Sequence, residues 1–292
     1  MVLATLPYPH FDPVLVQLGP FAIRWYALAY IFGLLLGWGG ILLLLRRKKL
    51  WAPPPYNGKP PATEDQIGDL VVWMTFGVIL GGRLGWELIY GVVLCSVSPY
   101  ADFCRGLPME FVTNPVKIVA AWEGGMSFHG GLLGVIIAMA WFCRRQKLNF
   151  LSIADLVAVV APIGLFFGRL ANFVNDELWG RVTNVPWAMV FPRGGDLPRH
   201  PSQLYEAGME GVGLFILLQF CLALGLHRRP GLLAAIFMLG YGVFRFVSEF
   251  FREPDAPFLG PVSMGMALSI PIWLAAGALF VISLKAPARA QA

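Results

Sequence analysis

Long apolar runs separated by short polar segments dominate the chain. Runs of about 20 mainly apolar residues, the length that an α-helix needs to cross a bilayer, recur along it. They predict seven transmembrane helices, at approximately Phe21 to Leu45, Asp69 to Gly91, Gly124 to Cys143, Ser152 to Phe173, Gly208 to Leu226, Gly231 to Phe250 and Val262 to Leu284. We therefore expect an all-α membrane protein in which residues 1–292 form a single integral membrane domain.

The composition agrees with this pattern. Hydrophobic residues make up 57% of the 292 positions, charged residues make up 13%, and the mean hydropathy is +0.66. A soluble domain carries about twice that share of charge. The net charge of +5 raises the question of a nucleic-acid partner, but the basic residues concentrate in short loops. We therefore expect contact with anionic lipid headgroups and no nucleic acid.

Basic residues follow every odd-numbered run and predict the orientation. They are Arg46 to Lys49, Arg144 with Arg145 and Lys147, Arg228 with Arg229, and Lys285 with Arg289. Because cytoplasmic loops collect Lys and Arg, the N-terminus is expected outside, in the periplasm, and the C-terminus in the cytoplasm. The earliest Lys or Arg is Arg24, so we expect no cleavable signal peptide.

The connecting segments suggest a linker and a small cap. Residues 46–66 form a proline-rich cytoplasmic linker, which ends in a helix start at Thr63-Glu64-Asp65-Gln66 and predicts an interfacial helix. Residues 92–121 and 181–205 form outer-face loops that could cap the bundle. Cys95 and Cys104 share the first loop, where they could form a disulfide or be ordinary loop residues. No metal-ligand spacing occurs, so neither a metal nor another cofactor is expected.

The segment Gly168 to Arg181 places polar groups directly on the end of an apolar run. The preceding run, from Ser152 to Phe167, has Asp155 as its only charge. Ionisable groups at membrane depth are expensive, so they indicate function. The polar positions of interest in this segment are Arg169, Asn172, Asn175 and Glu177.

Other runs bring polar side chains to the same side of the membrane. Tyr241, Arg245 and Glu249 are spaced i, i+4 and i+8 on one helix face, near the outer end of the sixth run. His129 lies one to two turns below the outer surface. It precedes two glycines that allow close approach of another backbone or a ligand.

Three further positions have ordinary structural interpretations as well as functional ones. Tyr26, at the outer end of the first run, fits an aromatic belt at the membrane surface. Arg83 and Glu87, at i and i+4, fit a self-contained ion pair. The run Arg199 to Glu206 adds hydrogen-bonding groups at the same level.

The convergence of these groups predicts an anionic ligand. Arg169 and Arg245 would repel each other across one cavity unless an anion lay between them, and Glu177 and Glu249 offset only part of their charge. Guanidinium groups suit phosphate. The ligand expected from these residues is the headgroup of an anionic phospholipid from the outer leaflet.

These motifs together resemble one family. The segment Gly168 to Gly180 resembles the signature of the bacterial phosphatidylglycerol:prolipoprotein diacylglyceryl transferases. His129-Gly130-Gly131, the run Arg199 to Glu206 and the run Tyr241 to Arg252 resemble the family's other recurrent segments, in the same order. The likeness spans most of the chain, although the linker around Trp51 to Pro61 and the loop around Cys95 to Cys104 match nothing in it.

The resemblance implies an enzyme of the bacterial inner membrane. Such an enzyme transfers the diacylglyceryl group of phosphatidylglycerol to the thiol of a lipobox cysteine in a preprolipoprotein, forming a thioether and releasing glycerol phosphate. The implied partners are phosphatidylglycerol, lipobox-containing preprolipoproteins and the lipid bilayer. The implied catalytic residues are His129, Arg169, Arg245 and Tyr26, and the implied lipid-binding residues are Arg169, Asn172, Asn175, Glu177, Gly180, Tyr241 and Glu249.

Each residue type suits a part of that reaction. Arg169 and Arg245 can stabilise the negative charge that the leaving phosphate accepts. His129 can accept the thiol proton as a base or serve only as a hydrogen-bond donor, and Tyr26 and Tyr241 can orient the headgroup or relay the proton. Two supporting roles are expected. The arginines are held in place by Asn172, Asn175 and Glu177, and Gly180 permits a turn.

The alternative is a transporter or ion pathway with seven spans. In that case a translocation route would be lined by five charged residues, Arg83, Glu87, Arg169, Arg245 and Glu249. Such a route needs polar groups in the inner half of the membrane, where the runs are almost purely apolar. The transferase interpretation is therefore preferred.

Overall fold

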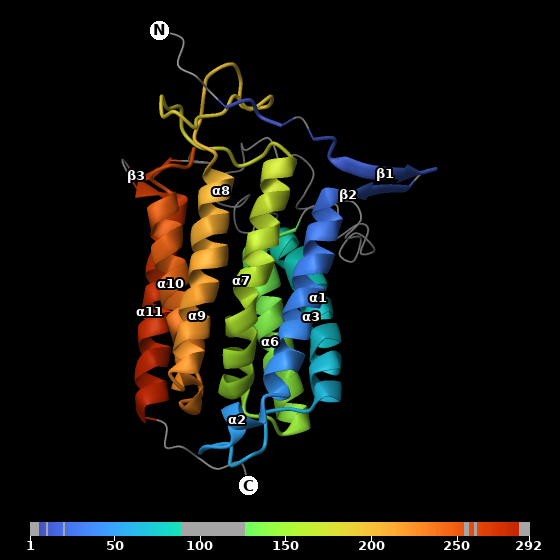
Figure 1. Cartoon of the computed structure of the whole chain (residues 1–292), viewed down its shortest axis with the longest axis vertical. Helices are drawn as coiled ribbons and strands as arrows, with labels where there is room; N and C mark the ends of the chain where they lie inside the picture. Colours follow the sequence, from blue (N-terminus) through green and yellow to red (C-terminus); the bar gives the residue numbers. More distant parts are fainter. Residues whose placement is uncertain are drawn as a thin grey trace. The chain divides into compact units, whose positions relative to one another are not determined.

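The computed structural model describes residues 6–9, 11–19, 21–88, 126–253, 257–259 and 262–285. The chain forms two compact units (Figure 1). The first contains Met1–Pro60 and Leu151–Ala292, and the second contains Pro61–Phe150. Within the described residues, a helix occupies most of each of the seven predicted runs.

The described helices identify a helical multi-pass membrane protein. The first unit contains α1 (Trp25–Leu45), α2 (Lys48–Trp51), α7 (Phe150–Val174), α8 (Ser202–Glu206), a π-helical segment (Ala207–Gly213), α9 (Leu214–Ala223), a 3₁₀ turn (Leu226–Arg228), α10 (Leu232–Ser248) and α11 (Met264–Lys285). The second unit contains α3 (Glu64–Gly85) and α6 (Phe128–Gln146). Five helical segments are long and apolar enough to cross a membrane, namely Trp25–Leu45, Glu64–Leu88, Phe150–Val174, Ser202–Ala223 and Gly265–Lys285, and Leu232–Ser248 is a shorter apolar helix.

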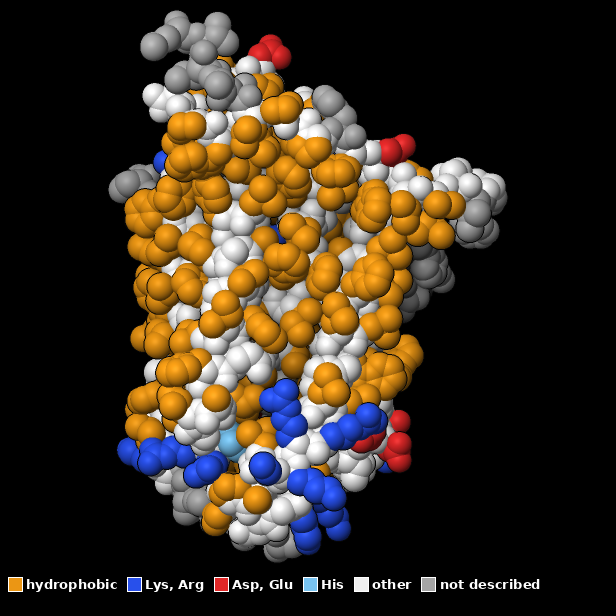
Figure 2. Space-filling view, in the orientation of Figure 1, with side chains coloured by type: hydrophobic (Ala, Val, Ile, Leu, Met, Phe, Trp, Pro, Cys, Tyr) orange, Lys and Arg blue, Asp and Glu red, His pale blue; other side chains and the backbone are white. Residues whose placement is uncertain are grey.

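Large hydrophobic side chains cover much of the molecular surface. Leu274 on α11 is 71% exposed, and Ile216 and Phe220 on α9 are similarly open. Figure 2 shows hydrophobic side chains over the middle of one face and Lys and Arg side chains at the end that carries α2. A soluble protein rarely exposes apolar patches of this extent, so these surfaces are suited to lipid.

Two short antiparallel hairpins depart from the predicted all-α fold. Strands β1 (Val14–Leu18) and β2 (Phe21–Arg24) pair with Leu18 opposite Phe21, and β3 (Pro257–Leu259) pairs with β4 (Val262–Ser263). The prediction that the first helix begins at Phe21 is therefore wrong, because Phe21–Arg24 is a strand. A hydropathy window cannot separate an apolar strand from the apolar helix that follows it.

The expected interfacial helix before the second run is instead the first turn of α3. The Thr63 side chain accepts a hydrogen bond from the Gln66 backbone nitrogen at 3.2 Å, and the Gln66 side chain accepts one from the Thr63 backbone at 2.9 Å. This reciprocal capping box begins the long helix itself. The predicted linker thus ends at Thr63, and the short helix that it contains is α2.

Glycines allow α3 and α6 to pack at very short range in the second unit. A Cβ atom on Gly85 would lie 2.5 Å from the Cα atom of Gly130, and one on Gly81 would lie 2.7 Å from the Cα atom of Gly134. Any side chain at these positions would force the helices apart. Small residues spaced four apart are a common means of helix association in membranes.

A buried carboxylate fixes the start of α10 against α7. Asp155, which is 3% exposed, accepts hydrogen bonds from the backbone nitrogens of Gly231 and Ala234, each at 2.8 Å. These nitrogens lack partners within the first turn of a helix, and the helix dipole favours a negative charge there. The one charge in the apolar part of the fourth run is therefore a cap for another helix.

The segment after α7 has a small core of its own. The Tyr8 hydroxyl donates a hydrogen bond to the Phe173 carbonyl at 2.7 Å, and the rings of Tyr8, Phe173 and Phe191 contact one another. Phe191 has no exposed surface. Residues 175–201 lie over the end of α7 in Figure 1, and the last residues of the predicted loop at 181–205 belong to α8. The other predicted loop, 92–121 with Cys95 and Cys104, lies outside the described residues; Cys143 and Cys221 are free thiols.

Candidate active site

The polar segment after the fourth run is shaped by two residues with left-handed backbone. α7 ends at Val174, and Asp176 and Leu178 then adopt φ angles of 53° and 60°. Such angles are uncommon in non-glycine residues, and Gly180, which was predicted to permit the turn, is not among the residues with positive φ. Gly180 is needed for space, because a Cβ atom there would lie 2.5 Å from the Phe251 carbonyl oxygen and 2.6 Å from the His200 Cβ atom.

Arg169, on the last turns of α7, makes a two-sided contact with the helix that begins at Ser202. Its Nη1 atom lies 2.9 Å from a carboxylate oxygen of Glu206, and its Nη2 and Nε atoms lie 2.9 and 3.1 Å from one oxygen of Glu210. Both glutamates have no exposed surface. The guanidinium is thus held in one orientation by charge-assisted hydrogen bonds to Glu210 and an ion pair with Glu206.

Arg245, on α10, shares the same carboxylate. Its Nη1 atom lies 3.3 Å from the other oxygen of Glu206, and its Nη2 atom pairs with Glu249 one turn along the helix. Arg252 also approaches Glu206, at 3.4 Å. The Ser263 hydroxyl donates a hydrogen bond to Glu249 at 2.6 Å. Glu206 therefore joins three arginines from two segments of the chain.

We call this set of three arginines and three glutamates the Arg–Glu cluster; its members are Arg169, Arg245, Arg252, Glu206, Glu210 and Glu249. Its formal charges balance. The expectation that two arginines would require an external anion between them is therefore wrong, because the Glu206 carboxylate occupies that place. Charged groups in an apolar bundle are tolerated when they are paired in this way.

The cluster nevertheless keeps an accessible edge. The side chains of Arg169 and Arg245 are each 16% exposed, whereas Glu206 and Glu210 are fully buried. Part of each arginine side chain is therefore open to a ligand, whereas these two carboxylates are not. Tyr241 lies one turn before Arg245 on α10, near both arginines.

Tyr26 belongs to a tyrosine pair on α1. Its hydroxyl lies 3.5 Å from that of Tyr30, and the two rings are 5.1 Å apart. Tyr30, which was not predicted, lies within electrostatic range of Arg169 and Glu177. The first helix thus brings phenol groups to the same end of the first unit as the Arg–Glu cluster.

The predicted supporting residues divide into two groups. Asn172 donates a hydrogen bond to a Glu177 carboxylate oxygen at 2.8 Å, so Glu177 is held by an amide. In the part of the chain that the structure describes, Glu177 forms no ion pair with an arginine, and the prediction that it offsets Arg169 and Arg245 is wrong. Asn175 continues the hydrogen-bond pattern of α7, because its backbone nitrogen donates to the Ala171 carbonyl at 2.9 Å.

The run Arg199 to Glu206 attaches the loop to the helix. The Tyr205 hydroxyl lies 3.1 Å from His200 Nδ1 and accepts a hydrogen bond from the Trp187 indole at 2.6 Å. Burial lowers the pKa of His200 below its ordinary value. The Arg199 guanidinium lies over the Trp179 ring, 5.9 Å from its centroid. These contacts position Glu206 and leave only that residue of the run in the Arg–Glu cluster.

His129 lies in the second unit, in the first turn of α6. Ser127 caps that helix by accepting a hydrogen bond from the Gly130 backbone at 3.2 Å, and the His129 side chain is exposed. Gly130 is explained by its contact with α3 rather than by a ligand. In the same unit Arg83 and Glu87 form a buried ion pair at 3.2 Å. This is the self-contained ion pair that their spacing suggested.

Glu210 is the cluster residue that the sequence analysis missed. It lies four residues after Glu206, on the same face of the helix, inside the predicted fifth run. A carboxylate within an apolar run was the signal that could have identified it. No group of three or more His, Cys, Asp and Glu side chains suited to a metal occurs among the described residues.

Comparison with known proteins gives one consistent family. The profile described as "Prolipoprotein diacylglyceryl transferase" matches residues 13–282. The chain is 51% identical over 292 residues to a phosphatidylglycerol--prolipoprotein diacylglyceryl transferase of Rhodospirillum rubrum, covering 98% of this chain and 97% of the relative. An enzyme of the same description from Paramagnetospirillum magneticum is 49% identical, covering 98% of this chain and 98% of the relative. Another, from Rhodopseudomonas palustris, is also 49% identical, covering 91% of this chain and 87% of the relative.

Proposed function

Because this chain belongs to the prolipoprotein diacylglyceryl transferase family, we propose that it transfers the diacylglyceryl group of phosphatidylglycerol to the lipobox cysteine of preprolipoproteins. The observation that supports this proposal most directly is the Arg–Glu cluster, which has two partly exposed arginine side chains, because guanidinium groups suit a phosphate. Its fully buried glutamates hold those groups in place without a ligand.

The proposed setting is the bacterial inner membrane. Seven spans with the N-terminus in the periplasm would put the Arg–Glu cluster in the outer half of the bilayer, and the basic loop around α2 on the cytoplasmic side. In the first unit, the cluster and α2 lie toward opposite ends of the helices (Figure 1). This arrangement supports the orientation, since phosphatidylglycerol would reach the cluster from the outer leaflet.

Arg169 and Arg245 would bind the phosphate diester of phosphatidylglycerol through their partly exposed side chains. The bond between the glyceryl carbon and the phosphate oxygen breaks during transfer, so the phosphate gains negative charge. Preorganised cations stabilise that charge more in the transition state than in the ground state. The glutamates fix the guanidinium groups beforehand, and Asn172 and Tyr241 complete the binding edge.

The other reacting group would be the substrate thiol. Its sulfur attacks the glyceryl carbon, a carbon–sulfur bond forms, glycerol phosphate leaves, and the thiol proton must be accepted. We assign that proton to His129, the predicted base, with Tyr26 and Tyr30 as hydrogen-bonding groups near the cluster. No cysteine of this chain lies in the predicted motifs, so the reactive sulfur belongs to the peptide.

A reconstituted reaction tests the proposal. Purified protein is incubated with phosphatidylglycerol and a lipobox peptide, and the peptide is examined by mass spectrometry. The expected product is heavier by one diacylglyceryl group, and a peptide with serine in place of the lipobox cysteine should gain nothing. If folded protein that binds phosphatidylglycerol produced no such adduct, the transporter alternative would become the better explanation.

A further inference from the structure

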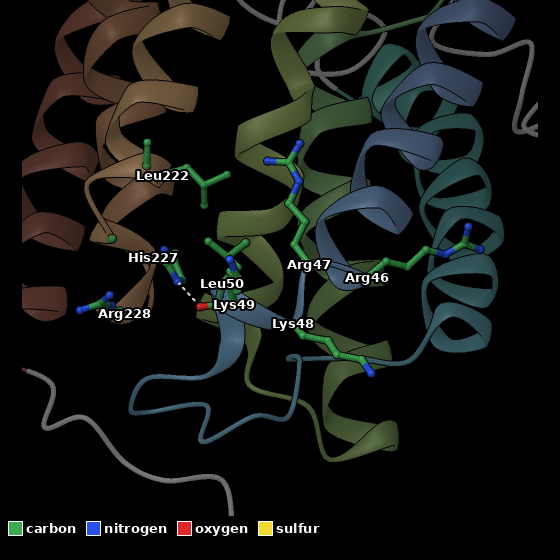
Figure 3. Close-up of a pocket in the computed structure, with 10 residues that line it drawn as sticks. Arg46, Arg47, Lys48, Lys49, Leu50, Leu222, His227 and Arg228 are labelled. Atoms are coloured by element: carbon green, nitrogen blue, oxygen red, sulfur yellow. Dashed lines mark hydrogen bonds between the residues drawn. The ribbon is translucent and has the colours of Figure 1, made fainter.

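A second cationic site lies at the other end of the first unit. A pocket of about 500 Å³ opens where the segment after α1 meets the end of α9 (Figure 3). One wall consists of Arg46 to Leu50, and the other contains Leu222, Ala223, Gly225, His227 and Arg228. All of these residues belong to the first unit.

The lining combines charge with an apolar patch. Five of its side chains are Arg or Lys, none is Asp or Glu, and Leu50, Leu222 and Ala223 supply the hydrocarbon surface. In Figure 3, the Arg47 side chain extends away from Lys48 and Lys49, up to the level of Leu222. This combination suits a molecule that carries a phosphate beside an aliphatic chain.

Four of the cations in this pocket differ from those of the Arg–Glu cluster in their ion pairing. Arg47, Lys48, Lys49 and Arg228 form no ion pair with any residue that the structure describes. Like charges around one pocket repel one another, and an anion removes that repulsion. His227 adds no charge near neutral pH, because burial lowers its pKa.

Hydrogen bonds hold the wall of this pocket in place. His227 Nε2 forms a hydrogen bond with the Leu50 carbonyl at 2.9 Å, and the Trp51 indole donates one to the Leu44 carbonyl at 2.9 Å. The Tyr56 hydroxyl bonds both the His227 carbonyl and the Ser152 side chain, each at 3.2 Å. Trp51 is 2% exposed. A charge that served only to orient the chain in the membrane would need no such scaffold.

We infer that this pocket binds the phosphate headgroup of an anionic phospholipid from the membrane leaflet on its own side, separately from the Arg–Glu cluster. The cations contact the phosphate, and the first acyl carbons lie along Leu222 and Ala223. Basic pockets between transmembrane helices are suited to such headgroups. The inference goes beyond the proposed transfer reaction, and it assigns the lipid a binding role only.

The test compares two variants of equal charge. Arg47→Gln with Arg228→Gln removes one arginine from each wall, whereas Arg144→Gln with Arg145→Gln removes two exposed arginines that do not line the pocket. Binding of dioleoyl phosphatidic acid to the purified protein in detergent is measured by native mass spectrometry, with phosphatidylcholine as the neutral lipid. We expect the pocket variant to retain one phosphatidic acid fewer, with at least about tenfold weaker binding at that site, and the control to match the wild type.

Further arms separate the sources of phosphate and the effect of folding. Inorganic phosphate at the same concentration should not displace the lipid, because it lacks the apolar part; displacement would overturn the lipid assignment. Arg47→Lys with Arg228→Lys keeps the charge and should retain binding. Equal loss in the pocket and control variants, or wild-type binding in the pocket variant, would overturn the inference. Since the readout is lipid retention, failure of the transfer reaction would not affect it.

Discussion

A guanidinium nitrogen of Arg169 lies 2.9 Å from a carboxylate oxygen of Glu206, a residue with no exposed surface. The contact joins α7 to the helix that follows the loop. One ion pair thus connects two segments whose relative position the proposed reaction requires to stay fixed. The second oxygen of Glu206 faces Arg245 and Arg252. Removal of this carboxylate would leave three arginines with a reduced counter-charge.

Replacement of Glu206 by glutamine should therefore lower stability and abolish transfer. Breaking a buried ionic network from one side typically costs about 3–5 kcal/mol. The measurements are the unfolding midpoint in detergent and the rate of peptide modification. Glu253→Gln is the control, because Glu253 pairs with Arg199 at 2.9 Å but its side chain is 50% exposed, and its loss should cost less than about 1 kcal/mol. Equal effects of the two substitutions would show that Glu206 contributes no more to stability or transfer than an exposed carboxylate does.

Arg169→Ala should abolish transfer and weaken phosphatidylglycerol binding, whereas Arg169→Lys should restore only part of the activity. The lysine ammonium keeps the charge, but it cannot reproduce the separate contacts that the guanidinium makes with Glu206 and Glu210. Transfer rates and lipid affinity are measured for both variants in the same detergent. An alanine variant with full activity would remove Arg169 from the site.

His129→Gln distinguishes a base from a hydrogen-bond donor. If His129 accepts the thiol proton, the substitution should slow transfer by about 10²- to 10⁴-fold. The loss should shrink toward pH 9, because the peptide thiol, with a pKa of about 8.5, then supplies its own thiolate. The measurement is the ratio of wild-type to variant rates from pH 6 to pH 9. A constant ratio with a parallel fall in phosphatidylglycerol binding would identify His129 as a headgroup ligand.

His227 should make the fold sensitive to acid. Burial and the nearby charge of Arg228 lower its pKa, while its hydrogen bond to the Leu50 carbonyl partly opposes the shift. Below the ordinary histidine pKa of about 6.5, the unfolded chain therefore binds more protons at this residue than the folded chain. The contribution of His227 is fully present above that pH and is lost as the pH falls through it toward the folded value.

The check is the unfolding midpoint between pH 5 and pH 7.5 for the wild type and for His227→Gln. We expect a steeper decline on acidification in the wild type, because glutamine does not titrate. Parallel curves would mean that other groups dominate the acid response. The rings of Trp51 and Tyr56 pack against the His227 imidazole, and neither side chain titrates between pH 5 and pH 7.5.

The positions of the helices could be predicted from the sequence because length and hydropathy are local properties. A run of about 20 apolar residues satisfies its backbone internally only as a helix. The predicted run from Ser152 to Phe173 thus differs by at most two residues at either end from the helix Phe150–Val174. The prediction was wrong where an apolar stretch could form either a helix or a strand. Phe21–Arg24 pairs with Val14–Leu18 as a strand.

The charged groups at the end of α7 were also visible in the sequence, and they were predicted to be functional because charged residues at membrane depth are rare without a function. Arg169 and Arg245 were identified in this way, and the structure brings them to opposite sides of one carboxylate. What the sequence could not indicate was their partners. Glu177 is closer to Arg169 along the chain than Glu206 is, yet it bonds to Asn172.

That choice is made by tertiary structure. The rotation of each helix about its axis and the path of the loop after Val174 decide which side chains meet, and both depend on packing far along the chain. Asp155 illustrates the same limit: its sequence context suggests an isolated charge, and only the approach of Gly231 and Ala234 makes it the cap of α10. The sequence determined which segments enter the membrane and which charges enter with them, because burial in lipid depends on each segment's own composition. The pairing of those charges was decided by the fold, because an ion pair needs two segments at a defined distance.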